Sequence, residues 1–299
     1  MSSYLGSTII DSFGFNIIPV ITTETEDAFL MGTISEYSNY DLSQIYSYGL
    51  YSQSALTIFN TPNVTSIGNC AFAYCSNLVQ ISFPKCIYIG TSAFTYCSKL
   101  TQVSFPECIS ITSNIFYGCS NLTNVYLPKA VSSYFLNVFG ACYKLTDITL
   151  NFSQISQLSG TFSYCRSLTQ LLSFSQVTSI GAYTFYFCSG LTNISLPKVS
   201  SIGTYAFYGC SVLPQISLPN CTYIGGSAFQ YCSQLISINL KGISSIPTLA
   251  NSNAFSSTPI AGYSTYAEQL GSIYVPSSLY ESFLTATNWS FYSDRIVSI

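Results

Sequence analysis

A single cysteine position recurs along this chain at a nearly constant interval. Successive copies follow one another at almost equal steps, and the residues between them repeat one pattern of apolar and polar side chains. The step is about 22 residues, a period typical of solenoids, in which each repeat forms one coil and contacts only the coils beside it. We therefore predict one elongated repeat array. The recurring cysteines are Cys75, Cys97, Cys119, Cys142, Cys165, Cys188, Cys210 and Cys232.

The repeat follows the approximate consensus LxxIxLPxxCxxIGxxAFxYCS, and each part of it has a physical interpretation. The Ile-x-Leu pair alternates with period two, so both side chains of one short strand face the core. The proline ends that strand because it cannot donate a hydrogen bond to a sheet. The Ile-Gly pair predicts a turn in which glycine adopts a backbone that other residues resist. Ala-Phe-x-x-Cys is one helical turn long, so short helical or 3-10 turns are expected on the opposite wall.

The residues that follow the repeat consensus, which we call the frame, differ in composition from the residues before them. The frame covers residues 56–246 and is absent from residues 1–55. Residues 1–60 contain six acidic side chains and no Lys or Arg, whereas the rest of the chain carries eight basic and five acidic ones. We expect residues 1–55 to form an N-terminal cap or a docking segment.

The frame stretches near the C-terminus. Ile273-Tyr274-Val275-Pro276 matches the Ile-x-Leu-Pro part of the consensus, but it comes later than the repeat period requires. An inserted loop is therefore expected within residues 247–271. Residues 247–299, which contain the only tryptophan, Trp289, are predicted to be a stretched last repeat and a C-terminal cap, because terminal repeats must shield the last core layer.

These motifs resemble the BspA or treponemal type of bacterial leucine-rich repeat. The resemblance rests on LxxIxLP, Ile-Gly, Ala-Phe and the Cys-Ser that closes each unit, and it is strong over residues 56–246 and looser over 247–299. It implies a leucine-rich-repeat solenoid. Members of this family are mostly surface adhesins of host-associated bacteria and protists that bind matrix proteins or other cells. Similar arrays occur in bacteriophage-encoded proteins.

The composition argues against catalysis, metals and cofactors. The chain has no histidine, which removes the commonest general base, and its few acidic residues do not pair within the repeats. None of the twelve cysteines forms a Cys-x-x-Cys pair, so a zinc site is not expected. No glycine-rich phosphate loop follows a strand. We expect no enzyme activity and no cofactor.

Charge and hydropathy restrict the partners. The net charge is −3 and the eight Lys and Arg residues are scattered singly, which argues against nucleic acid. No run of eighteen apolar residues predicts a spanning helix, and the N-terminus lacks the basic region of a secretory signal. A protein or carbohydrate ligand remains as the expected partner, with self-assembly or docking through residues 1–55 as a further possibility.

The recurring cysteines favour packing over chemistry. Thiols at one repeat position stack behind one another as small buried hydrophobes, so we predict free, buried side chains. Coils one strand spacing apart also lie within the range of a disulfide, although side chains in register point the same way. A partial second series supports packing, because valine replaces cysteine at equivalent positions. Its members are Val64, Cys86, Cys108, Val199 and Cys221.

The outward positions of the predicted strands are the candidate ligand-binding residues. They form a nearly uncharged series of amides and hydroxyls on the concave face of the sheet, which suits hydrogen bonding to a carbohydrate or a peptide. The alternative is a solvated sheet face with no ligand. The candidates are Gln80, Gln102, Asn124, Tyr126, Asp147, Asn193, Gln215, Asn239 and Tyr274.

Two further series are expected on the surface. Tyrosines recur just before the stacked cysteines, where they either cover the rim of the core or form an exposed binding surface. Lys85, Glu107 and Lys129 follow the strand-ending prolines of three successive repeats and are expected to form a charge series of alternating sign. The tyrosines are Tyr74, Tyr96, Tyr117, Tyr164, Tyr186, Tyr208 and Tyr231.

Two functions fit these observations. The first is a non-enzymatic recognition or adhesion module that uses the concave polar sheet and the 247–271 loop. The second is a structural or receptor-binding component of a larger assembly, such as a phage tail, a virion or a filament, that docks through residues 1–55. The first places the protein at a cell surface or outside the cell, and the second in a virion.

Overall fold

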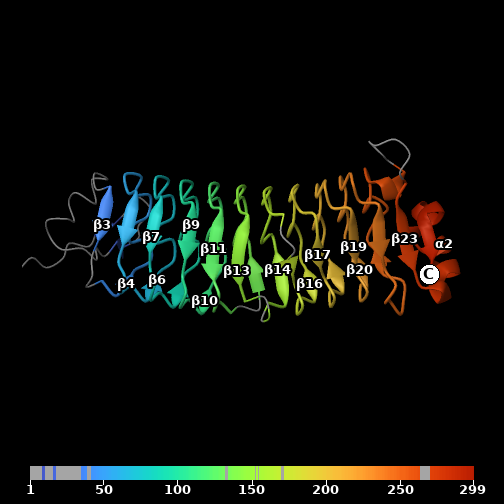
Figure 1. Ribbon diagram of the computed structural model, residues 1–299, viewed down its shortest axis with the longest axis horizontal. Coiled ribbons are helices and arrows are strands. Elements are labelled where there is room, and N and C mark those ends of the chain that lie inside the picture. The colour runs from blue at the N-terminus through green and yellow to red at the C-terminus, as the bar shows by residue number, and fades with distance from the viewer. Residues whose placement is uncertain are drawn as a thin grey trace, which may run out of the picture.

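A computed structural model describes residues 9–10, 16–17, 35–38, 42–131, 134–151, 153, 155–169, 172–262 and 270–299. From residue 35 onward the described chain winds into a row of stacked coils, with β3 at one end and α2 at the other (Figure 1). The fold is a parallel β-solenoid of about 11 turns with little helix. The predicted leucine-rich-repeat solenoid is confirmed.

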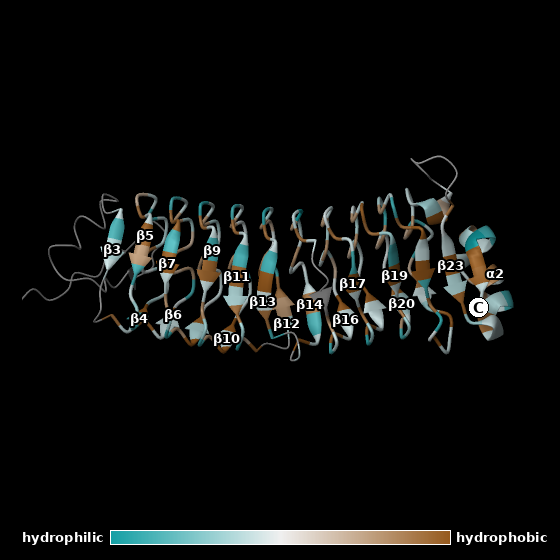
Figure 2. Cartoon of the chain, viewed as in Figure 1, coloured by the Kyte–Doolittle hydropathy of each residue, from teal (hydrophilic) through white to brown (hydrophobic). Residues whose placement is uncertain are grey.

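Each coil has three walls: a first sheet, a second sheet and a wall of turns. The chain runs along a strand of the first sheet, turns, and adds a shorter strand to the second sheet. It then returns through the turn wall. Figure 2 shows hydrophilic and hydrophobic residues alternating along the strands of the first sheet. This alternation is the period of two that sends every second side chain into the core.

The first sheet contains the Ile-x-Leu parts of the repeats. Its paired strands are parallel and in register, so equivalent residues of neighbouring coils lie side by side. Its strands are β3 (Glu36–Ser38), β5 (Ile58–Asn60), β7 (Gln80–Ser82), β9 (Gln102–Ser104), β11 (Asn124–Leu127), β13 (Asp147–Leu150), β15 (Leu172–Ser173), β17 (Ile194–Ser195), β19 (Gln215–Ser217), β21 (Ser237–Asn239), β23 (Ser272–Val275) and β24 (Ile296–Ser298).

The second sheet contains the residue pair that ends at the isoleucine of Ile-Gly, and its strands are also parallel. They are β4 (Gln44–Ile45), β6 (Ser66–Ile67), β8 (Tyr88–Ile89), β10 (Ser110–Ile111), β12 (Tyr134–Leu136), β14 (Gln157–Ser159), β16 (Ser179–Ile180), β18 (Ser201–Ile202), β20 (Tyr223–Ile224) and β22 (Thr248–Leu249). Near the N-terminus, β1 (Ile9–Ile10) pairs antiparallel with β2 (Asn16–Ile17).

The Ala-Phe-x-x-Cys segments form tight turns rather than the expected helical turn. In the first of them, the Ala73 amide donates to the Cys70 carbonyl within the coil (3.1 Å), whereas the Phe72 amide donates to the Ala93 carbonyl of the next coil (2.7 Å). A helix would direct every amide to its own segment and leave none to join the coils. The alternating pattern instead requires a positive φ at Cys70 (53°) and Tyr74 (64°).

The glycine of Ile-Gly is needed for a different reason than the sequence suggested. The φ of Gly90 is not positive, and the positive value falls two residues later, at Ser92 (57°). A Cβ atom at Gly90 would lie 2.7 Å from the Asn69 nitrogen and the Gly68 carbonyl carbon of the preceding coil. Glycine is therefore required because two backbones approach closely, not because of its own conformation.

The core is a continuous stack of phenylalanines. Rings at the Ala-Phe position lie parallel from coil to coil, with centroid separations between 5.0 Å for Phe72–Phe94 and 5.9 Å for Phe116–Phe139. The stack continues to Phe229–Phe255, at 5.5 Å. Such side chains each contribute about 1.5–3 kcal/mol of burial, and only the next coil provides the apolar surface that buries them. Stability therefore resides in the interfaces between coils.

The repeating coil begins upstream of residue 56. β3 pairs with β5 and β4 with β6, both in parallel register. Tyr37 is buried and stacks on Phe59 at 5.0 Å, and Leu50 is buried as well. The part of residues 1–55 from residue 35 onward thus adds a coil to the array. The acidic residues Asp11, Glu24, Glu26, Asp27 and Asp41 lie outside the described residues.

The stretched region continues the solenoid before it adds residues. Leu249 of β22 pairs with Ile224 of the preceding coil, and the two are little more than one repeat period apart in sequence. Only a few of the inserted residues therefore come before Leu249. The 3-10 helix η2 (Pro259–Ala261) follows. The rest of the insertion falls largely on residues 263–269, which lie outside the described part of the chain.

The C-terminal residues close the end of the core. They form the 3-10 helix η3 (Ser277–Leu279), the helix α2 (Tyr280–Thr285) and the 3-10 helix η4 (Trp289–Arg295), after which β24 returns to pair with β23. Trp289 is buried against Phe283, at 5.1 Å between ring centroids. No helix among the described residues is long and apolar enough to cross a membrane.

Candidate functional site

The register of the first sheet brings three of the candidate polar residues into one row. Asn124 pairs with Gln102 on one side and with Asp147 on the other. All three side chains are exposed, and the Asn124 Nδ2 donates to Asp147 Oδ2 at 3.5 Å. The row therefore presents amide donors and acceptors next to a carboxylate.

Tyr126 stands beside this row and protrudes from it. Its register partners are the short side chains of Ser104 and Thr149, and its own side chain is 45% exposed. An aromatic ring between two hydroxyl residues offers an apolar face next to groups that donate and accept hydrogen bonds. Together with the row, Tyr126 makes this part of the sheet the best-formed polar surface among the candidates.

The other candidates form a separate group or stand apart. Gln215 is exposed and pairs with Ser237, whereas Asn239 and Tyr274 pair with each other and are half-buried. The Asn239 Oδ1 accepts the amide of Lys241 at 2.9 Å, so this side chain supports a local turn.

Gln80 and Asn193 are both exposed. Gln80 pairs with Ile58 near the N-terminal end of the sheet, and Asn193 precedes β17. Residues 170–171, which precede β15 in the coil between Asp147 and Asn193, lie outside the described part of the chain. The nine candidates therefore do not form one continuous surface among the described residues.

The structure places the eight recurring cysteines in the core. Each is buried, and each Sγ donates to a main-chain carbonyl of the preceding coil, as Cys97 does to Phe72 at 3.1 Å. Burial raises the pKa of the Cys119 thiol to about 12, because the apolar core disfavours the thiolate. Within the described residues, no group of three or more metal-binding side chains occurs.

The tyrosines before the cysteines form a partly exposed series along the turn wall. Tyr74 stacks on Tyr96 at 5.1 Å, and further along the wall Tyr186 stacks on Tyr208, also at 5.1 Å. Tyr231 continues the series and is 49% exposed. These rings shield the turns beneath them and also present aromatic surface to solvent.

The expected charge series is only partly formed. Lys129 and Glu107 make an ion pair at 2.6 Å on the surface. Lys85 instead donates to the Asn63 side chain at 2.8 Å. Asn63 is in the preceding coil, and it competes with Glu107 for the same ammonium group.

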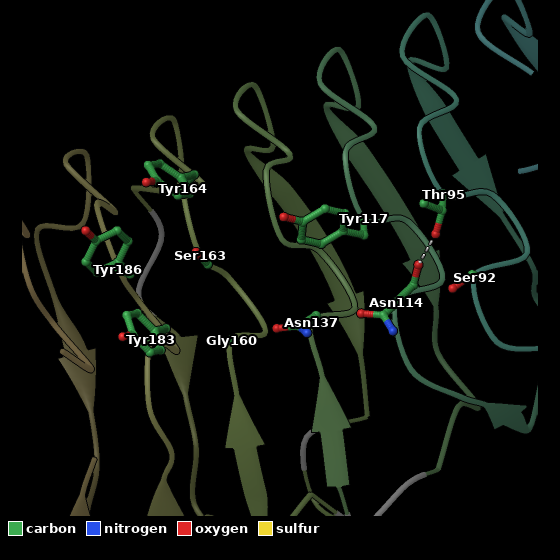
Figure 3. A pocket seen from close by; sticks show the side chains of 10 residues that line it. All are labelled: Ser92, Thr95, Asn114, Tyr117, Asn137, Gly160, Ser163, Tyr164, Tyr183 and Tyr186. Carbon is green, nitrogen blue, oxygen red and sulfur yellow. Dashed lines mark hydrogen bonds between the residues drawn. The ribbon is translucent and has the colours of Figure 1, made fainter. Parts of the chain in front are cut away.

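A hollow in the turn wall was not predicted from the sequence. It has a volume of about 490 Å³ and is bordered by Tyr117 on one side and by Tyr164, Tyr183 and Tyr186 on the other (Figure 3). The signal for it is present in the sequence, because the coil that contains Gly140 has no tyrosine before its cysteine.

Comparison with known proteins supports the fold. A family model of the BspA type leucine rich repeat region matches residues 43–169 and 158–282. A leucine rich cell surface protein from Faecalibacterium prausnitzii shares 23% identity over 89% of this chain and 78% of its own, with a TM-score of 0.50. No curated protein matches the chain.

Two further solved structures are similar. A leucine-rich repeat protein from Bacteroides ovatus shares 20% identity over 90% of this chain and 85% of its own, with a TM-score of 0.41. The leucine rich repeat protein of T. pallidum shares 22% identity over 60% of this chain and 78% of its own, also with a TM-score of 0.41. Because the family model covers most of the repeating coils, the chain belongs to the BspA type leucine rich repeat family.

Proposed function

We propose that this protein is a non-enzymatic recognition or adhesion module, and that its first sheet presents a polar face to a protein or glycan ligand. Family membership supports a protein-binding or adhesion surface. The repeated coils provide a rigid backbone, so the outward side chains are held at fixed spacings before a ligand binds. A surface prepared in this way loses little conformational entropy on binding.

The observation that carries this proposal is the position of Tyr126 next to the row of Gln102, Asn124 and Asp147. The parallel register holds these four side chains together on three adjacent strands. The tyrosine provides an apolar anchor, and the amides and carboxylate provide directional hydrogen bonds. Tyrosine is also among the residues that contribute most to binding at protein interfaces.

The test uses the full-length protein and a defined set of probes. Wild-type protein and the variants Tyr126→Ser and Asp147→Asn are applied to a glycan array and to a panel of immobilised matrix proteins. Serine matches the hydroxyl residues on either side of Tyr126, so the sheet is expected to stay intact. We expect at least one probe to bind the wild type, and each variant to bind it at least tenfold more weakly.

Tyr88→Ser is the matched control, because Tyr88 is an exposed tyrosine on a strand of the second sheet. It should bind the same probe as tightly as the wild type. The proposal is overturned if no probe binds the wild type, or if the Tyr126 variant binds normally.

A further inference from the structure

The aromatic residues of the turn wall fall at three positions that repeat from coil to coil, and most coils fill one or two of them with a ring. Two of them have a positive φ and lie four residues apart, as Tyr183 (57°) and Phe187 (53°) do. The third lies between them and is occupied by Tyr186 in the same coil. The rings contact one another from coil to coil, so the wall is covered by an aromatic series wherever these positions hold large residues.

The aromatic series is interrupted over one coil. Asn137, Gly140 and Ala141 occupy the three positions there, and none of them provides a ring. In the following coil, Tyr164 is the one ring at the three positions, since Gly160 and Ser163 occupy the other two. Among the described residues, Tyr117 makes no ring contact with the next coil, unlike Tyr96 before it and Tyr164 after it. The hollow of about 490 Å³ lies over this gap.

Close packing keeps the two sides of the hollow in place. The Tyr117 ring lies over Gly140, where a Cβ atom would come within 2.7 Å of it. On the other side, Phe187 of the following coil stacks on one face of the Tyr164 ring at 5.6 Å and 9°. The guanidinium of Arg166 lies 5.7 Å from the Tyr164 ring centroid and helps to hold that ring.

The floor of the hollow offers hydrogen-bonding groups that the protein does not use. Asn114 and Asn137 are half-buried there, and neither side-chain amide makes a hydrogen bond to another described residue. Gly160 is the residue that leaves room for this arrangement, since a Cβ atom on it would lie 1.9 Å from the Asn137 Oδ1. Each amide can donate two hydrogen bonds and accept two.

The chemistry of the lining selects one class of ligand. None of the ten residues that border the hollow is charged, so the lining itself offers no ion pair to a phosphate or a carboxylate. Tyrosine faces stack well on the apolar C–H faces of a pyranose ring, and amide and hydroxyl groups match the alternating donors and acceptors of sugar hydroxyls. The volume is within the range of about 300–1,000 Å³ that is usual for small-ligand sites.

We infer that this hollow is a binding site for a neutral glycan, in which a pyranose unit lies between Tyr117 and the tyrosines opposite it and hydrogen-bonds to Asn114 and Asn137. The site is on the turn wall, whereas the surface in the proposed function is on the first sheet. The two are therefore independent, and a variant of one leaves the other unchanged.

The experiment fills the hollow without removing any residue that lines its aromatic sides. Ser163→Tyr introduces the tyrosine that the neighbouring coils carry as Tyr186 and Tyr208, so the wall can accommodate it. Binding is measured by saturation-transfer NMR with oligosaccharides of glucose, mannose, galactose and N-acetylglucosamine. We expect the wild type to bind at least one of them, and Ser163→Tyr and Asn137→Ala to weaken that binding at least tenfold.

Two control variants locate the effect. Tyr231→Ala removes an exposed ring of the same wall outside the hollow, and Tyr126→Ser alters the first sheet. Both should bind the oligosaccharide like the wild type. The inference is overturned if no oligosaccharide binds the wild type, or if binding survives in Ser163→Tyr. Loss in Tyr126→Ser instead would place the glycan on the first sheet.

Discussion

The indole Nε1 of Trp289 donates a hydrogen bond to the carbonyl of Pro247 at 2.7 Å. The two residues are distant in sequence, and Trp289 is buried. This contact joins the C-terminal cap to the last regular coil. Phe255, the last ring of the phenylalanine stack, lies 6.0 Å from the Trp289 ring. The cap therefore covers the end of the core with both a hydrogen bond and an aromatic contact.

Replacement of Trp289 should destabilise the whole array. Trp289→Phe leaves the buried Pro247 carbonyl without its partner, which costs about 1–3 kcal/mol, and the smaller ring leaves a cavity as well. Urea denaturation followed by circular dichroism should show the lower midpoint. Phe291→Ala is the control, since Phe291 is 73% exposed and should leave the midpoint unchanged. An unaltered midpoint in Trp289→Phe would contradict this role of the cap.

The cysteines should differ sharply in their reactivity. Cys70 is half-buried, whereas the other eleven are buried. At pH 8 a maleimide should label Cys70 alone in the native protein and all twelve thiols in urea, as counted by mass spectrometry. In Cys70→Ser, native labelling should disappear. Rapid labelling of the stacked cysteines in the native protein would show that the core opens readily.

Stability should fall above pH 9 because of the buried thiols. Burial raises the pKa of Cys86 from 9.0 to about 12, so only the unfolded chain loses this proton between those values. The contribution of the thiol to stability is complete below pH 9 and is lost at about 1.4 kcal/mol per pH unit above it. Cys86→Val, which copies Val64 and Val199, should remove this share of the pH dependence. The free energy of unfolding is measured by urea denaturation at several values between pH 9 and 11. If it fell equally steeply with pH in the wild type and in Cys86→Val, the prediction would be contradicted.

The glycine of Ile-Gly should not tolerate a side chain. Gly90→Ala forces a Cβ atom against the backbone of the preceding coil, so a loss of about 1–3 kcal/mol is expected in thermal denaturation. Gly262→Ala tests the effect of backbone conformation without a steric clash. The φ of Gly262 is +80°, and a Cβ atom there would meet only the flexible end of the Arg295 side chain, at 3.7 Å. That variant should lose about 1–2 kcal/mol, the usual cost of a left-handed backbone in a residue with a Cβ atom. A smaller loss at Gly90 than at Gly262 would refute the close-approach explanation.

The surface ion pair should matter little. Both Lys129 and Glu107 are 52% exposed, and pairs of this kind contribute about 0–1 kcal/mol. Glu107→Gln should therefore shift the urea midpoint only slightly, and high salt should remove even that shift. A large loss would mean that the charge series sets the register of the coils.

Much of this fold follows from local sequence. The nearly constant repeat period, the alternation in Ile-x-Leu and the strand-ending proline are all visible along the chain, and they predicted the solenoid and its first sheet. They also indicated the row that contains Asn124 and Tyr126, because equivalent outward residues of in-register parallel strands must lie side by side. Whether those residues bind a ligand remains a prediction.

Three features were decided only by contacts between coils. Local propensity suggested a helical turn at Ala-Phe-x-x-Cys, but amides such as that of Phe72 bond to the next coil, which exists only after stacking. Gly90 is required by the backbone of the preceding coil, which is a full repeat away in sequence. The hollow over Gly140 is an absence of rings in one coil, and it has a shape only because Tyr117 and Tyr164 border it. The sequence by itself determined the coil, and the stacking of coils decided how its walls are bonded and where a ligand can enter.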